Sequence, residues 1–177
     1  TEKVNIFYEN NQKTTIPVTM EPAESFFVVF RETFDFKNKQ KTDKEFKGSV
    51  DNITTPWKVQ FDSKFGGPKM SVTLDQSEDW TQNADSSIKY YSGTAIYTNK
   101  FSIGKLYKNA KITIGFYGPI YNIATIRING IDCGTLWTPP YSLDISNAVK
   151  RGKNLIEVEV TNTWHNRLIG DSPLPKD

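Results

Sequence analysis

The chain has 177 residues, enough for one domain or for one domain with part of a neighbour, and too few for a (β/α)8 barrel of about 250 residues. Its 22 basic and 20 acidic residues leave a net charge of +2, which gives no indication of the concentrated basic face that nucleic acid binding requires. No run approaches the roughly 20 apolar residues of a membrane-spanning helix, so we expect no membrane span.

The N-terminal part of the chain differs in pattern from the rest. Residues 25–30, SFFVVF, are apolar on both alternating faces, which predicts a strand covered on both sides. The polar, lysine-rich residues 37–52 predict a linker or a long surface loop. We therefore divide the chain into residues 1–48, the terminal strands of a preceding small β region with a lysine-rich linker, and residues 49–177, a β-sandwich.

Apolar and polar residues alternate in five later runs, at residues 57–61, 70–74, 95–101, 112–116 and 156–160. Alternation with a period of two predicts strands with one buried and one exposed face, which antiparallel sheets packed face to face require. Eleven Phe, eight Tyr and four Trp against two Met also favour sheets over helices. We expect at most a short helical turn, beginning at Ser146 and ending before Gly152.

The dipeptide Asn129-Gly130 lies between two of these apolar segments and predicts a two-residue hairpin turn. Such a turn fixes three cross-strand pairs: Ile128 with Ile131, Arg127 with Asp132, and Ile126 with Cys133. This pairing favours the interpretation of Cys133 as a small core residue over that of a reactive thiol. Because it is the single cysteine, no disulfide can form within the chain, and cysteine usage leaves the cellular compartment open.

The order of short motifs along these strands carries a family resemblance. The motifs are YYSGTAIY at 90–97, ATIRING at 124–130, GTLW at 134–137, PYSLDI at 140–145 and GKNLIEV at 152–158. This series resembles the jelly-roll, galactose-binding-like sugar-binding domain of family 2 glycoside hydrolases. TNTW at 161–164 with NRLIGD at 166–171 looks more particularly like the C-terminal region of family 106 glycoside hydrolases, the α-L-rhamnosidase type. Residues 25–31 are similar to the strand that precedes this domain in such enzymes.

The resemblance implies an all-β jelly-roll β-sandwich, galactose-binding domain-like, within a multidomain bacterial enzyme that degrades polysaccharides. It also implies an exported protein, periplasmic or at the cell surface, whose catalytic carboxylates lie on an upstream barrel. The implied partners are that upstream catalytic domain of the same polypeptide and an oligosaccharide. No residue of this chain matches the family's catalytic positions, so none is assigned a catalytic role.

The carboxylates of the chain offer two possible roles, an acid/base pair and a set of metal ligands. Glu157 and Glu159 lie two apart on the predicted polar face of a strand, which favours a solvated sheet surface over a catalytic pair. The acidic residues around Trp80 are Asp75, Glu78, Asp79 and Asp85. Their spacing matches no compact calcium loop, so calcium stays an alternative and we expect no cofactor.

The segment TNTWHNRLIGD at 161–171 holds the single histidine of the chain. His165 with Asp171 lacks a nucleophile-elbow motif and further metal ligands, so neither a catalytic nor a metal role is predicted for it. We expect the segment to continue the strand 155–160 and then leave the sheet. Arg167 and Asp171 would fix that exit by hydrogen bonds or an ion pair, while Leu168 and Ile169 pack down.

Aromatic rings beside amide and guanidinium groups are the side chains that bind saccharides. The candidate carbohydrate-binding or interdomain residues are Trp137, Tyr141, Trp164, His165, Asn166 and Arg167. The alternative, which we favour, is that Trp137 and Trp164 fill the sandwich core or press against a neighbouring domain. The leading interpretation is a non-catalytic C-terminal accessory domain of a glycoside hydrolase that buttresses the catalytic domain and contributes to carbohydrate binding. A self-sufficient carbohydrate-binding module and a purely structural interaction domain remain open.

Overall fold

The computed structural model describes residues 8–10, 13–18, 20, 25–30, 51–54, 56–75, 79–107, 110–116, 120 and 122–172. The chain divides into two compact units, Thr1–Asp51 and Asn52–Asp177. In the first unit, β1 (Tyr8–Asn10) pairs antiparallel with β2 (Lys13–Thr15). The predicted linker at 37–52 lies, except for its last two residues, outside the described residues.

The prediction of a doubly covered strand at residues 25–30 is wrong. These six residues form no strand, and all are exposed, with Phe27 97% and Phe30 75% accessible. An apolar run forms a buried strand only where two layers cover it, and the described part of the first unit supplies no such layers.

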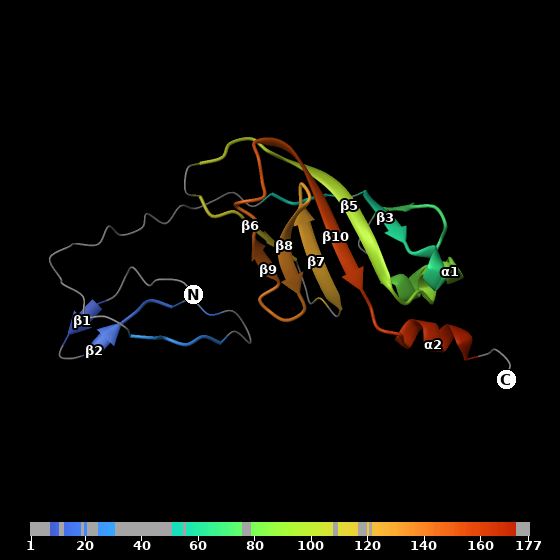
Figure 1. Cartoon of the computed structure of the whole chain (residues 1–177), viewed down its shortest axis with the longest axis horizontal. Coiled ribbons are helices and arrows are strands. Elements are labelled where there is room, and N and C mark those ends of the chain that lie inside the picture. Colours follow the sequence, from blue (N-terminus) through green and yellow to red (C-terminus); the bar gives the residue numbers. More distant parts are fainter. Residues whose placement is uncertain are drawn as a thin grey trace. The chain divides into compact units, whose positions relative to one another are not determined.

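The second unit is built on a six-stranded antiparallel sheet with the order β4-β3-β5-β10-β7-β8 (Figure 1). Its strands are β3 (Trp57–Phe61), β4 (Val72–Leu74), β5 (Thr94–Ile103), β7 (Ile123–Ile128), β8 (Ile131–Leu136) and β10 (Gly152–Thr161). A two-stranded sheet consists of β6 (Thr113–Gly115) and β9 (Ser142–Asp144). The short helices are η1 (Ser63–Phe65), η2 (Trp80–Gln82), α1 (Ser86–Lys89) and α2 (His165–Asp171).

The small sheet packs on one face of the large sheet and makes a sandwich core. Ile126, Ile128 and Ile156 from the large sheet are at most 1% exposed in this core, and Ile114 of β6 and Leu143 of β9 pack against it. The alternating runs place these apolar side chains on one face and polar ones on the other, as the sequence predicts. The all-β sandwich is therefore confirmed.

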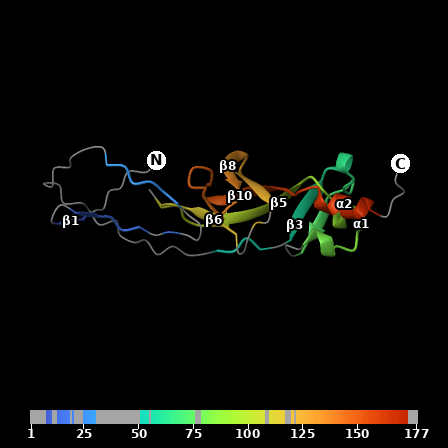
Figure 2. The same cartoon turned by 90° about the horizontal axis from the view of Figure 1, so that it is seen from below.

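A second core cluster lies where the small sheet does not extend. Phe61, Trp80 and Tyr91 meet edge to face, with ring centroids 5.0–5.7 Å apart. The Trp80 indole N–H also donates to the Tyr97 hydroxyl at 2.6 Å. Trp80 of η2 and Ile88 of α1 pack on the same face of the sheet as the buried side chains of β3 and β5. These two short helices therefore cover that face at this end. Figure 2 shows β3, α1 and α2 gathered at one end of the unit.

The β7–β8 hairpin follows the prediction next to the turn and departs from it two residues later. Asn129 and Gly130 have φ of 53° and 81°, and the pairs of Ile128 with Ile131 and Arg127 with Asp132 are both present. The predicted pair of Ile126 with Cys133 is wrong, because a β-bulge between Ile126 and Arg127 places Gly134 opposite Ile126. Gly134 has a φ of 123°, which a residue with a side chain rarely adopts.

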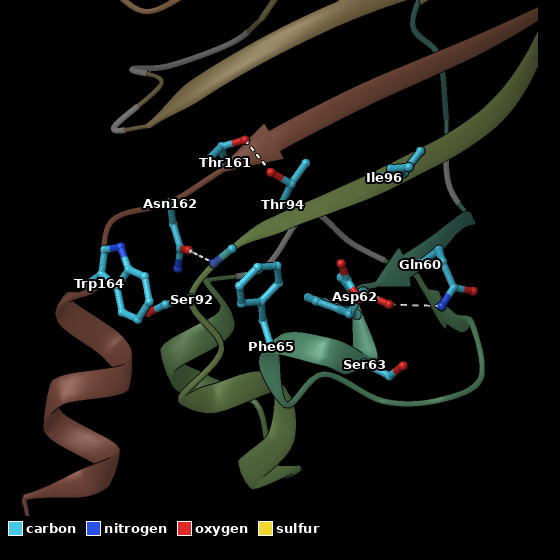
Figure 3. A pocket seen from close by; sticks show the side chains of 12 residues that line it. Gln60, Asp62, Ser63, Phe65, Ser92, Thr94, Ile96, Thr161, Asn162 and Trp164 are labelled. Carbon is cyan, nitrogen blue, oxygen red and sulfur yellow. Dashed lines mark hydrogen bonds between the residues drawn. The ribbon is translucent and has the colours of Figure 1, made fainter.

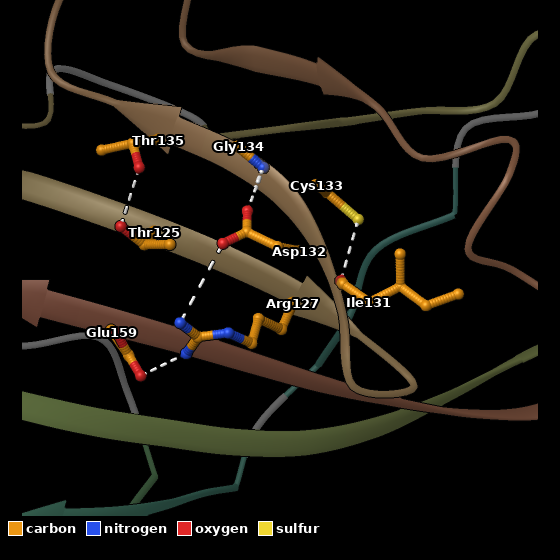
Figure 4. A network of polar contacts seen from close by, with 8 residues as sticks. All are labelled: Thr125, Arg127, Ile131, Asp132, Cys133, Gly134, Thr135 and Glu159. Atoms are coloured by element: carbon orange, nitrogen blue, oxygen red, sulfur yellow. Dashed lines mark hydrogen bonds and ion pairs between the residues drawn. The ribbon is translucent and has the colours of Figure 1, made fainter.

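Cys133 is half-buried and packs against the sandwich core, in agreement with its predicted role as a small core residue. Burial raises the pKa of its thiol, which disfavours the reactive thiolate at neutral pH. Figure 4 shows its side chain beside Ile131, whose carbonyl it contacts at 3.5 Å.

Helix is more extensive than predicted. A turn does form at residues 146–148, but Asp144 begins it by accepting hydrogen bonds from the backbone N–H and the hydroxyl of Ser146. The seven-residue α2 exceeds the single short turn expected. None of the helices in the described ranges has the length and apolar character that crossing a membrane requires.

Candidate functional site

Five strands begin or end at the same end of the large sheet. The register aligns Phe61, Ala95, Val160, Ala124 and Leu136 across β3, β5, β10, β7 and β8. β3 and β8 end on this row and β10 ends one residue beyond it, while β5 and β7 each begin one residue before their member of the row. The segments that follow these strands, including those with Trp137 and Trp164, are therefore presented from one end of the sheet.

A pocket of about 630 Å³ opens at this end, on the polar face of the sheet, between η1 and the start of α2 (Figure 3). Thr94, Ile96 and Thr161 line it from β5 and β10. Phe65 contributes from η1 and Trp164 from the start of α2. This volume lies within the range typical of small-molecule sites in proteins.

Hydrogen bonds within the chain fix the back wall of the pocket. The Asn162 side chain accepts from the Gly93 N–H at 2.8 Å and donates to the Tyr91 carbonyl at 2.8 Å. The Thr94 and Thr161 hydroxyl oxygens lie 2.7 Å apart across β5 and β10. Because these bonds join segments about 70 residues apart, the wall is held independently of any ligand.

α2 is fixed against the turn before β5. The backbone N–H of Arg167 donates to the Ser92 hydroxyl at 3.0 Å. Gly170 lies so close to Tyr90 that a Cβ at Gly170 would approach the Tyr90 Cβ to 2.7 Å. The predicted pairing of Arg167 with Asp171 is confirmed, with Nε and Oδ2 2.9 Å apart, and it spans one turn of the helix.

The predicted packing of Leu168 and Ile169 is wrong, since these side chains are 66% and 50% exposed. The alternative that Trp137 and Trp164 fill the core is also wrong, because they are 71% and 68% exposed. α2 turns its Gly170 face toward Tyr90 in the turn before β5, and Leu168 and Ile169 are left on the outside.

The six predicted contact residues form two groups rather than one site. Trp164, His165, Asn166 and Arg167 are consecutive at the start of α2, and of these Trp164 lines the pocket. Trp137 and the half-buried Tyr141 lie on the connection between β8 and β9, outside the pocket lining.

Sequence reasoning missed the residues that face Trp164 across the pocket. These are Gln60, Asp62, Ser63 and Phe65, which lie about 100 positions earlier in the chain. The stretch DSKFGG at 62–67 holds a local signal: Asp62 caps η1 by accepting the Lys64 N–H, and Gly66 closes it at a φ of 83°. A capped tight turn presents Phe65 outward, 51% exposed.

Several of the other carboxylates have structural roles. Arg127 pairs with Glu159 and lies 4.0 Å from Asp132 on the polar face (Figure 4). The hydrogen bond from Arg127 to Glu159, with the charge of that carboxylate, raises the pKa of the guanidinium. Asp79 and Asp85 cap η2 and α1. The described residues contain no group of three or more His, Cys, Asp or Glu placed to hold a metal, and Glu78 lies outside them.

These features define an all-β sandwich domain with an open pocket at the end of its large sheet. No family model matches the chain. It is 42% identical over 123 residues to a protein named "Putative beta-glucuronidase" from Formosa agariphila, a match to 68% of this chain and 10% of that protein. The chain thus spans about a tenth of this curated relative.

Solved glycoside hydrolases contain the same fold. A rhamnosidase from Novosphingobium sp. PP1Y matches 97% of this chain with 16% of its own, at a TM-score of 0.81 and 32% identity. A β-glucuronidase from Ruminococcus gnavus matches 62% of this chain with 20% of its own, at a TM-score of 0.51 and 26% identity. The chain is therefore similar to one domain of larger glycoside hydrolases.

Proposed function

We propose that the chain is a non-catalytic accessory β-sandwich domain of a multidomain bacterial glycoside hydrolase. The observation that carries this proposal is the match of 97% of the chain to only 16% of a rhamnosidase. In this proposal the parent enzyme is of the family 106 α-L-rhamnosidase type and is exported, and the sandwich has jelly-roll topology. Residues 1–48 finish a preceding β region, and the upstream catalytic domain is the partner.

The carboxylates of the pocket support a non-catalytic role. Glycoside hydrolysis generally uses two carboxyl groups about 5–9.5 Å apart on either side of the scissile bond. The pocket lining contains one carboxylate, Asp62. Glu159 is held by Arg127, and Asp171 by Arg167.

The exposed apolar residues support a buttressing role. Trp137, Leu168 and Ile169 are each at least 50% exposed, and all follow strands that end at the same end of the large sheet. Apolar residues gathered at one end of a domain mark a surface for another protein segment. We assign this surface to the catalytic domain of the same polypeptide.

Two measurements test the proposal. The chain alone, incubated with aryl glycosides, is expected to release no aglycone, and turnover would refute the non-catalytic assignment. In the full-length enzyme, Leu168→Asp with Ile169→Asp is expected to separate the thermal unfolding of this domain from that of the catalytic domain. The control is Leu106→Asp, which alters a 37% exposed leucine just after the opposite end of β5. Equal effects of the two changes would refute docking through α2.

A self-sufficient carbohydrate-binding module is the second candidate, and the pocket beside Trp164 favours it. It predicts saccharide affinity in the chain alone and no coupling to a catalytic domain. A purely structural interaction domain predicts the coupling without the affinity.

A further inference from the structure

We infer that the pocket between η1 and α2 is a subsite for a neutral saccharide ring, with Trp164 and Phe65 as its stacking surfaces. The choice of a saccharide rests on the proposed function. The location of the subsite and its preference for uncharged rings come from the lining of the pocket.

Two exposed aromatic rings supply the apolar side of the pocket. Trp164 is 68% and Phe65 51% exposed, and both line the same cavity. Figure 3 shows them on either side of Ser92 and Asn162. Within the described part of the chain, neither ring pairs with another aromatic side chain. Because each residue is more than half exposed, both rings offer surface to the C–H face of a sugar.

Polar groups gather on the other side of Phe65. Gln60, Asp62 and Ser63 lie there, away from Trp164 (Figure 3). Asp62 uses one carboxylate oxygen to accept the Lys64 N–H, and Gln60 uses its amide N–H to reach the Phe61 carbonyl. The second Asp62 oxygen and the Gln60 amide oxygen remain as acceptors for hydroxyl groups.

This arrangement differs from the back wall, whose polar groups bond one another. The Asn162 side chain accepts from the Gly93 N–H and donates to the Tyr91 carbonyl, and the Ser92 hydroxyl accepts from the Arg167 N–H. The pocket thus has a preformed wall, an aromatic side and a hydrogen-bonding side. A pyranose has the same division between an apolar face and a rim of hydroxyls.

The charge of the lining selects between sugars. Among the described residues that line the pocket, Asp62 is the single charged side chain, and none is a lysine, arginine or histidine. Arg167 is not a lining residue; its Nη1 lies 2.9 Å from the position of a Cβ on Gly66, and its Nε is paired with Asp171. A uronic acid would bring its carboxylate close to Asp62, and like charges at short range repel. The pocket therefore favours a neutral hexose or 6-deoxyhexose over a uronate, although one relative is named as a glucuronidase.

The test is a titration of the 177-residue chain followed by the tryptophan indole signals in ¹H–¹⁵N NMR spectra. The ligands are the methyl glycosides of a neutral hexose, a 6-deoxyhexose and glucuronic acid. At least one neutral glycoside is expected to shift the Trp164 signal, with weaker or no binding of the glucuronide. Trp164→Ala should weaken neutral binding roughly tenfold or more. Asp62→Asn, which keeps an oxygen to cap η1, should reduce the difference in affinity between the neutral glycosides and the glucuronide.

The matched control is Trp137→Ala, which removes a 71% exposed tryptophan outside the pocket and should leave affinity unchanged. If Trp164→Ala unfolds the chain, Phe65→Ala gives the same test from the other side. The inference is overturned by no shift with either neutral glycoside, by equal losses in the two tryptophan variants, or by tighter binding of the glucuronide. If the chain binds no sugar but its unfolding remains coupled to the catalytic domain, this inference fails and the accessory role stands. If the chain binds sugar but shows no such coupling, docking is refuted and the subsite stands.

Discussion

Asn154 is the most connected buried polar side chain at the start of β10, and its replacement tests how the β7–β8 hairpin is attached to the sheet. It is 2% exposed. Its amide oxygen accepts from the Asn129 side chain and the Lys150 N–H, both at 2.8 Å. Its amide N–H groups donate to the carbonyls of Lys150 and Gly152 at 2.8 and 2.9 Å.

Asn154→Ala removes all four bonds, but their costs differ. The carbonyls of Lys150 and Gly152 belong to exposed residues, so water can replace the lost donors there. The Asn129 amide and the Lys150 N–H lose an acceptor in a part-buried setting, at about 1 kcal/mol each. With a smaller contribution from lost packing, we expect the free energy of unfolding to fall by about 2–3 kcal/mol.

Urea denaturation followed by tryptophan fluorescence measures this change as a shift of the midpoint at a common slope. Asn147→Ala is the matched control, because Asn147 is exposed in the neighbouring turn and should alter stability by less than about 0.5 kcal/mol. A loss for Asn154→Ala that equals the control would show that these four hydrogen bonds add nothing net to the fold.

Three further predictions concern other parts of the second unit. Because burial raises the pKa of Cys133, its thiol should react with a disulfide reagent at pH 8 more slowly in the native chain than in urea, and equal rates would contradict that burial. Hydrogen bonds from Ser146 lower the pKa of Asp144 below 3.8. The stability that these bonds add is therefore present above pH about 4 and is lost as the pH falls through the pKa of the folded state. Asp144→Asn should make the free energy of unfolding depend less on pH below about 4, and an unchanged dependence would contradict this. Gly170→Ala would place a Cβ 2.7 Å from the Tyr90 Cβ, so it should lower the free energy of unfolding by about 1–3 kcal/mol. A neutral or stabilising effect would show that α2 is not docked at this position.

The strands were predictable because alternation depends only on local spacing. Val59 and Phe61 are buried as the pattern requires, and so are Ile156 and Val158. The β-bulge at Ile126 was not predictable, since a turn dipeptide fixes pairing only near itself. Residues farther from the turn follow the twist of the strands and the packing of Leu143 beside Gly134.

α2 and the pocket depend on contacts between distant parts of the chain. The stretch TNTWHNRLIGD contains Gly170 and no strong helical pattern, and its helix is held by Ser92, 75 positions earlier than Arg167. Phe65 reaches the neighbourhood of Trp164 only because β3 and β10 flank β5. Knowledge of the strand order, which no single segment encodes, is needed to bring the two rings together.

The two edges of the large sheet restrict how this unit can meet other proteins. One edge, β4, has three residues, and the other, β8, is interrupted by the bulge opposite Ile126. Neither offers a long regular row of free backbone groups on which a foreign strand could be added, so the sheet resists edge-to-edge aggregation. For this sheet we therefore expect contact with another polypeptide to depend on side chains, among which Trp137, Leu168 and Ile169 are exposed at the strand ends.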